Sequence, residues 1–291
     1  MRILVTADLH YDIARSRPAV LELRDEVCRV GGDALVLVGD SAGADLDVLA
    51  QCLKLFAEFV GRKFFVPGNH CLWCRSGEDS LVRYERMVPQ VAASEGFSVL
   101  DHEPAVLGEV GLVGSIGWYD YSFRDESLRI PKAFYRAKVA PGAAAYYEAE
   151  YGHLIEAHAD DLTDEHLTIA SRWMDGQHVR LGMSDEQFTA KLSQALARQI
   201  EELSPRVERI VAFTHHLPFL QLVPPDRPAK FAFAAAYMGA QQLGRVLMDS
   251  PKVTHVYCGH SHWHAEMQIG HIKAVNVGST YVNKRLEVLE L

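Results

Sequence analysis

Residues 2–10 read RILVTADLH, and this stretch decides the fold because a short apolar run ends there in an aspartate and a histidine. Its first six residues have the length and β-branched content of a buried strand. Two runs of the same kind follow at 34–38 (ALVLV) and 63–66 (KFFV). Between them, residues 18–30 and 45–60 carry apolar side chains at helical spacing. This β-α-β-α-β series predicts a largely parallel sheet in an α/β protein.

The rest of the chain divides into strand-rich and helix-rich parts. Strand-like runs continue at residues 106–116, 208–213, 253–258, 265–269, 272–277 and 286–289. We expect the last three to add antiparallel strands. Residues from about 119 to 206 contain few such runs, and 183–203 is strongly helical. The pattern predicts one domain over residues 1–291, a sandwich of strands with a helical, cap-like insertion at about 119–206.

Composition excludes several classes of protein. Of the 291 residues, 48% are apolar and 23% are charged, as in ordinary globular proteins. No run approaches the roughly 20 apolar residues of a membrane span. The first residues lack the basic region and long apolar run of a secretory signal, so we expect a cytoplasmic protein. The net charge of −9 disfavours nucleic acid as a partner, because that affinity comes mostly from Lys and Arg at phosphates.

The stretch VPGNHCLWC at residues 66–74 contains a C-x-x-C, formed by Cys71 and Cys74. Such a pair could be a redox site or half of a zinc site. A four-thiolate zinc site needs a second close pair, and none of the other three cysteines provides one. We interpret the two cysteines as ordinary thiols, and we expect the preceding Asn69-His70 turn to carry the chemistry.

Polar residues follow the predicted core strands. They are Asp8 and His10, Asp40, Asn69 and His70, His215 and His216, and His260, His262 and His264. The carboxyl ends of strands in open α/β sheets gather ligands, so these side chains can converge on one rim. On an extended backbone, the spacing of Asp8 from His10, and of His260 from His262, would place each pair on one side.

Two carboxylates, an amide and several imidazoles form a mixed oxygen and nitrogen donor set that suits Mn²⁺, Fe²⁺ or Fe³⁺, or Zn²⁺. The donors are too many for one tetrahedral ion, so two ions that share a carboxylate are the more natural expectation. Two ions about 3.5–4 Å apart activate a water and stabilise an in-line displacement at phosphorus.

The ordered set DLH, GD, GNH, THH and GHSH resembles the calcineurin-like metallophosphoesterase family. The family pattern is D-x-H, G-D, G-N-H-(D/E), a lone His after a strand, and G-H-x-H. The resemblance covers residues 4–70 and 209–280 and leaves the insertion unmatched. It implies the family fold, a four-layer α/β sandwich of two mixed β-sheets flanked by helices.

The resemblance also implies a role for each matched residue. Asp8, His10 and His262 would bind one metal ion, Asn69, His215 and His260 would bind the other, and Asp40 would bridge both and be catalytic with His70. A hydroxide between the ions would attack phosphorus, and His70 would contact the phosphate and protonate the leaving alkoxide. We expect the substrate to be a small phosphodiester or phosphomonoester, such as a nucleotide.

Two alternative functions stay open, and the sequence differs from the patterns of related enzymes at two places. A DNA or RNA nuclease of the same superfamily is the first alternative, and the acidic balance disfavours it. A non-catalytic interaction scaffold is the second, but all seven ligand positions are present. Cys71 stands where the family commonly has Asp or Glu. The D-R-G of protein phosphatases is missing after Gly39-Asp40, so a protein Ser/Thr phosphatase is disfavoured.

A few residues have weaker sequence support. Trp118 and Tyr119 follow a predicted strand and could bind substrate or simply pack the insertion. His264 continues the alternation of the two histidines before it and could line the rim. We expect His216 to be structural. Arg227 or Lys230 could meet a phosphate, although a solvated turn is the main expectation there.

Overall fold

A five-stranded mixed sheet contains the first strands of the chain in the computed structural model, which describes residues 1–75, 77–225 and 228–291. Its strand order is β11-β1-β2-β3-β4, and every neighbouring pair is parallel except β1 with β11. The strands are β1 Arg2–Ala7, β2 Ala34–Val38, β3 Arg62–Val66, β4 Phe97–Val99 and β11 Glu287–Glu290.

A six-stranded mixed sheet packs against the first sheet. Its order is β5-β6-β7-β8-β10-β9, with antiparallel pairs only at its two edges in the described residues. The strands are β5 Ala105–Leu107, β6 Val110–Ser115, β7 Arg209–Thr214, β8 Val253–Cys258, β9 Ala265–Ile269 and β10 Ile272–Asn276. The predicted run 106–116 is therefore a hairpin, which turns at Gly108 with φ +55°. In the tail, β9 with β10 and β11 with β1 form the expected antiparallel pairs, whereas β10 is also parallel to β8.

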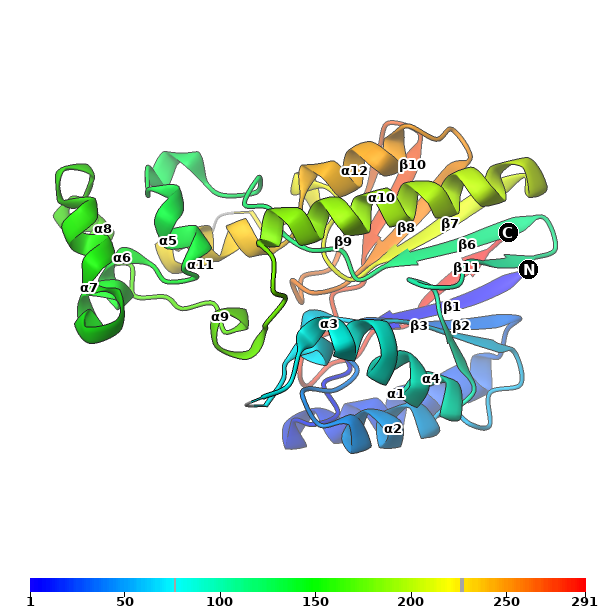
Figure 1. Ribbon diagram of the computed structural model, residues 1–291. Helices are drawn as coiled ribbons and strands as arrows, with labels where there is room; N and C mark the ends of the chain where they lie inside the picture. The colour runs from blue at the N-terminus through cyan, green and yellow to red at the C-terminus, as the bar shows by residue number, and fades with distance from the viewer. Residues whose placement is uncertain (76, 226–227) are drawn as a thin grey trace.

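The alternation of side chains along the strands builds the layers. In β2, Val36 and Val38 pack into the core between the sheets, whereas Leu35 and Leu37 pack under helices. Helices α1 Arg17–Val30, α2 Leu46–Lys54 and α4 Val88–Ser94 cover the outer face of the first sheet, and α10 Asp185–Leu203 and α12 Gln241–Met248 cover the second (Figure 1). The predicted four-layer sandwich is confirmed.

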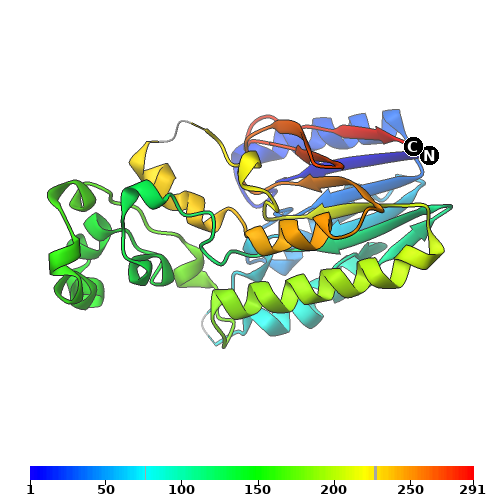
Figure 2. The ribbon, with the colours of Figure 1, turned by 90° about the horizontal axis from the view of Figure 1, so that it is seen from above.

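Several short helices project from one end of the sheets and form what we call the cap. They are α5 Lys132–Arg136, α6 Pro141–Tyr146, α7 Glu148–Ala157, α8 Asp164–Leu167, α9 Asp175–His178 and α11 Ala229–Ala234. Both chain termini lie at the opposite end of the sheets (Figure 2). Since β1 starts at the N-terminus, the carboxyl ends of the parallel strands point toward the cap. None of the described helices is long and apolar enough to cross a bilayer.

The predicted insertion at 119–206 contains one helix that belongs to the body. Helix α10 packs along β6 and against α12, and it buries Phe188, Leu192 and Leu196. The side chain of Gln199 also accepts a hydrogen bond from the backbone N–H of Gly114 in β6. Helical periodicity shows that a segment has an apolar face, but it does not show which sheet receives that face. The cap proper therefore precedes α10, and it also includes α11 from beyond β7.

Candidate metal centre

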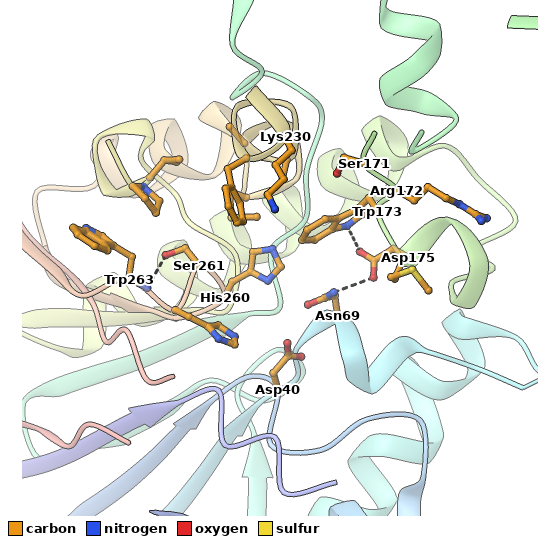
Figure 3. A pocket seen from close by; sticks show the side chains of 18 of the residues that line it. Asp40, Asn69, Ser171, Arg172, Trp173, Asp175, Lys230, His260, Ser261 and Trp263 are labelled. Atoms are coloured by element: carbon orange, nitrogen blue, oxygen red, sulfur yellow. Dashed lines mark hydrogen bonds between the residues drawn. The ribbon is translucent and has the colours of Figure 1, made fainter. Parts of the chain in front are cut away.

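The strands β1, β2, β3, β7 and β8 end at the rim that faces the cap, and their polar residues meet there. Three groups have ligand atoms within 4.8 Å of one another: Asp8 with His10 and His262, His10 with Asp40 and His70, and Asp40 with His215 and His260. Asp40 lies below His260 and Asn69 in the close view (Figure 3). The rim thus gathers all seven residues that the resemblance implied as ligands.

The imidazole nitrogens face one another in two pairs on either side of Asp40. Nε2 of His10 lies 3.1 Å from Nε2 of His262, and Nε2 of His215 lies 3.2 Å from Nδ1 of His260. Two nitrogen ligands of one tetrahedral ion would be about 3.3 Å apart, given metal–nitrogen bonds of about 2.0–2.1 Å. Oδ1 of Asn69 is also 3.2 Å from Nε2 of His215. The donor set and its spacing therefore fit metal ions.

Burial and charge at the rim also suit cations. Burial raises the pKa of the Asp8 carboxyl, so its charge lacks full compensation from the protein, and a cation beside it would supply that. Burial acts in the same direction on Asp40, but His215, His70 and His10 together outweigh it and hold its pKa well below the usual range. Asp40 is thus ionised at neutral pH, with Oδ2 3.4 Å from Nε2 of His215 and 3.9 Å from Nε2 of His10.

The backbone reaches this geometry through left-handed turns. Five of the seven candidate ligands have positive φ: Asp8 at 55°, His10 at 45°, Asp40 at 43°, His260 at 72° and His262 at 55°. Such angles are uncommon outside glycine, and at sites they mark a conformation that the surrounding structure imposes. Our explanation from extended spacing is therefore wrong, although its outcome, convergence of the paired side chains, is what the structure has.

The same turns explain why His264 misses the rim. The left-handed backbone at His260 and His262 ends the alternation of side-chain direction, so the side chain of His264 does not point the same way as theirs. Its Nδ1 lies 3.2 Å from the carbonyl oxygen of Val277 and 3.7 Å from Glu287, away from the cavity at the rim. The expected contact between His264 and substrate is corrected accordingly.

Two glycines in the motifs allow close approach. A Cβ on Gly39 would lie 1.9 Å from Nδ1 of His215, and a Cβ on Gly68 would lie 2.1 Å from Oδ1 of Asp40. No side chain fits at either position without displacing a candidate ligand. These close contacts explain why the sequence has glycine directly before Asp40 and Asn69.

The turn η2 Asn69–Leu72 presents His70 at the edge of the site. Its backbone N–H donates to Oδ1 of Asp40 (3.0 Å), and its ring stacks on Trp73 with centroids 3.8 Å apart. The two cysteines pack elsewhere. The thiol of Cys71 is near the N–H of Gly68, and the thiol of Cys74 is near the carbonyl oxygen of His178. Burial raises the pKa of Cys71 to about 12, so a reactive thiolate is disfavoured.

A cavity of about 790 Å³ opens between the rim and the cap. Its walls include aromatic and apolar side chains from distant parts of the sequence, among them Trp73, Trp173, Met174, Phe231, Trp263 and Tyr281. Sequence reasoning missed all of these, since no spacing signal joins them to the motifs. Lys230 also lines the cavity, whereas Arg227 lies outside the described residues.

Trp118 and Tyr119 are not on the cavity, so of the two roles that the sequence left open they have the packing role, and the suggested substrate contact is corrected. Both are fully buried, and they stack on each other with centroids 4.7 Å apart. Phe188 of α10 packs edge-on against Trp118, and His216 packs against both. His216 is itself buried, with Nδ1 3.0 Å from the carbonyl oxygen of Ile116, so these three residues form packing behind the rim.

The chain is similar to known proteins in sequence and in fold. The sequence model for calcineurin-like phosphoesterases matches residues 1–264. Among solved structures, phosphopantetheinyl hydrolase from Mycobacterium tuberculosis superposes with a TM-score of 0.66 at 18% identity, over 96% of this chain and 89% of that one. A dimetal phosphatase from Danio rerio gives 0.53 at 15% identity, over 96% and 87%. Comparison with curated proteins gave no match.

Proposed function

The chain belongs to the calcineurin-like phosphoesterase family and is a metal-dependent phosphoesterase, and from this premise we propose that it works with two metal ions. Asp8, His10 and His262 would hold one ion, and Asn69, His215 and His260 would hold the other, with Asp40 available to both. The observation that carries this proposal is the pair of close imidazole contacts on either side of one ionised carboxylate. Mn²⁺, iron and Zn²⁺ suit the donors.

The two ions, when bound, supply an activated water and neutralise charge at phosphorus. The side chains of the protein position the reacting groups and supply the proton. Asp40 holds the backbone N–H of His70 through Oδ1, which keeps the imidazole at the cavity edge. Nε2 of His70 lies 3.8 Å from Oδ2 of Asp40, and the His70 side chain is partly exposed and lines the cavity, so His70 is placed to protonate the departing alkoxide.

The cavity walls support an organic phosphoester as the substrate. A volume of about 790 Å³ leaves room for a sizeable group beyond the phosphate. Three of the four tryptophans line it, and Met174, Phe231 and Trp263 are exposed at its surface. Such walls favour an apolar or planar group, as in a nucleotide, on a small phosphodiester or phosphomonoester. Among the described residues these walls offer few cations for a nucleic-acid backbone, so a nuclease stays disfavoured. The cytoplasmic location expected from the sequence stays a prediction.

The Asp40→Ala variant tests this proposal. The wild-type protein, saturated with Mn²⁺, Fe²⁺ or Zn²⁺, should contain two ions per chain and hydrolyse organic phosphoesters from a panel of diesters and monoesters. Asp40→Ala should lose the shared ligand, hold fewer ions and lose turnover. Asp25→Ala, on the exposed surface of α1, is the matched control and should behave as wild type. A wild-type protein that never exceeds one ion per chain overturns the two-metal proposal.

A further inference from the structure

One buried carboxylate of the cap receives four hydrogen bonds beside the metal centre. Asp175, at the first residue of α9, is only 1% exposed. Its Oδ1 accepts from Nδ2 of Asn69 (2.9 Å) and Nε1 of Trp73 (2.7 Å), and its Oδ2 accepts from the hydroxyl of Tyr119 (3.1 Å) and Nε1 of Trp173 (2.8 Å). Figure 3 shows the bonds to Asn69 and Trp173. An ionised carboxylate has about four acceptor sites, so all of its capacity is used.

The first consequence concerns Asn69. An amide side chain has one donating and one accepting end, and only the oxygen can bind a metal ion. Because Asp175 only accepts, it holds the NH₂ group of Asn69 on the cap side. Oδ1 of Asn69 is then directed to the rim, 3.2 Å from Nε2 of His215. The cap residue thus sets which atom of Asn69 faces the metal centre.

The second consequence concerns His70. The indole of Trp73 lies between two imidazoles, with centroids 3.8 Å from His70 and 4.6 Å from His178 of α9. The hydrogen bond to Asp175 fixes this indole in its plane. Directly after His70, where the family pattern has an acidic residue, this chain has Cys71, whose buried thiol lies near the N–H of Gly68. The carboxylate that organises this turn therefore comes from the cap.

We propose that Asp175 is a positioning residue through which the cap orients Asn69 and Trp73. It thereby assembles the metal site of Asn69, His215 and His260, which we call the second metal site, and the aromatic surface on which His70 stacks. The inference rests on the proposed two-metal function. It also implies that the packing of α9 against the rim and the affinity for the second ion depend on each other, since the coupling between two such equilibria is reciprocal. Metal binding then protects α9, and an intact α9 strengthens metal binding.

The chain contains a matched control in Asp185, the first residue of α10. This carboxylate is also buried, and it accepts from Nε1 of Trp118, the hydroxyl of Tyr121 and Nζ of Lys138. It therefore offers a similar buried polar network at the start of α10, outside the cap, and none of these three partners is a candidate ligand. Loss of either carboxylate should disturb packing, whereas only loss of Asp175 should disturb the metal centre.

The experiment measures the affinity of each ion by chelator competition with Mn²⁺ or Zn²⁺ in Asp175→Ala and Asp185→Ala. Partners of metal ligands typically contribute about 10–100-fold to metal affinity, so Asp175→Ala should weaken the second ion by that factor while the first ion changes less. Asp185→Ala should keep both affinities. In wild type, metal loading should slow amide hydrogen exchange in α9, and in Asp175→Ala this protection should be lost.

Equal metal affinities in folded Asp175→Ala and Asp185→Ala would overturn the inference. If Asp175→Ala does not fold, the isosteric pair Asp175→Asn and Asp185→Asn is measured in the same way, because an asparagine amide must face two of the four N–H and O–H donors with its own NH₂. An at least tenfold weaker second ion in Asp175→Asn supports the inference, and equal affinity overturns it. A wild-type protein that binds fewer than two ions would instead contradict the proposed function.

Discussion

At the scale of single residues, His70 is the group whose chemistry is most open to test. Its imidazole is partly exposed to the cavity and has carboxylate and aromatic neighbours on the protein side. If it protonates the leaving group, His70→Ala should keep both metal ions and slow esters of poor leaving groups by about 10²–10⁴-fold. Activated aryl esters, which leave without a proton, should slow far less. Steady-state kinetics on a series of leaving groups measures the difference.

His264→Ala is the control for this series, since that histidine is close to the motif but lies away from the cavity. It should keep wild-type rates on every ester. If His70→Ala slowed good and poor leaving groups equally, His70 would be a phosphate contact and not an acid.

At the scale of elements, the turn η2 separates two interpretations of the stretch VPGNHCLWC. Asn69 and His70 reach the metal centre and the cavity, whereas Cys71 and Cys74 pack against different backbone groups. The double variant Cys71→Ser with Cys74→Ser should therefore keep most of its metal-dependent activity in both reducing and oxidising buffers. Activity assays with and without a thiol reductant check this. A folded, fully metallated double variant without activity would assign a function to the cysteine pair.

The elements also show where sequence patterns stop being informative. Strands β1, β2 and β8 begin and end where apolar runs predict, because a buried strand is recognisable within five or six residues. The strand β4 was missed because three residues carry too little pattern. The helix in α10 was predicted, but its place against β6 was not. An amphipathic pattern identifies an apolar face without identifying its partner.

At the scale of the whole molecule, Asp101 makes the stability depend on pH. It joins three parts of the fold: Oδ1 accepts from the N–H of Ile116 and the hydroxyl of Tyr84, and its backbone oxygen accepts from Gln199 of α10. Burial raises the pKa of its carboxyl to about 6. An aspartate in the unfolded chain has a pKa of about 3.9. Between this pH and the folded value, Asp101 is therefore protonated in the folded chain and ionised in the unfolded chain.

Because the pKa of Asp101 is higher in the folded chain than in the unfolded chain, protonation stabilises the fold. The contribution of Asp101 to the free energy of unfolding is fully present below about pH 4 and is lost as pH rises through about 6, by roughly 3 kcal/mol. Asp101→Asn cannot ionise, so its stability relative to wild type should improve by up to that amount between pH 4 and 7. Denaturant unfolding in the presence of a chelator measures it. A difference that stays constant with pH would contradict the assignment, and Asp25→Asn serves as the control.

The amino-acid sequence by itself, through its strand pattern and the family that its motifs resemble, identified the two-sheet fold and the seven residues that gather at its rim. Donor type, a preceding glycine and a strand end are properties of short stretches, and each can be recognised where it stands. Only the tertiary structure decided the left-handed turns that aim these side chains and the cap residues that support them. Asp175 meets Asn69 across 106 positions of sequence. Such a contact depends on how the cap folds back over the rim, and local patterns record which face of a segment is apolar or polar but not what it will touch.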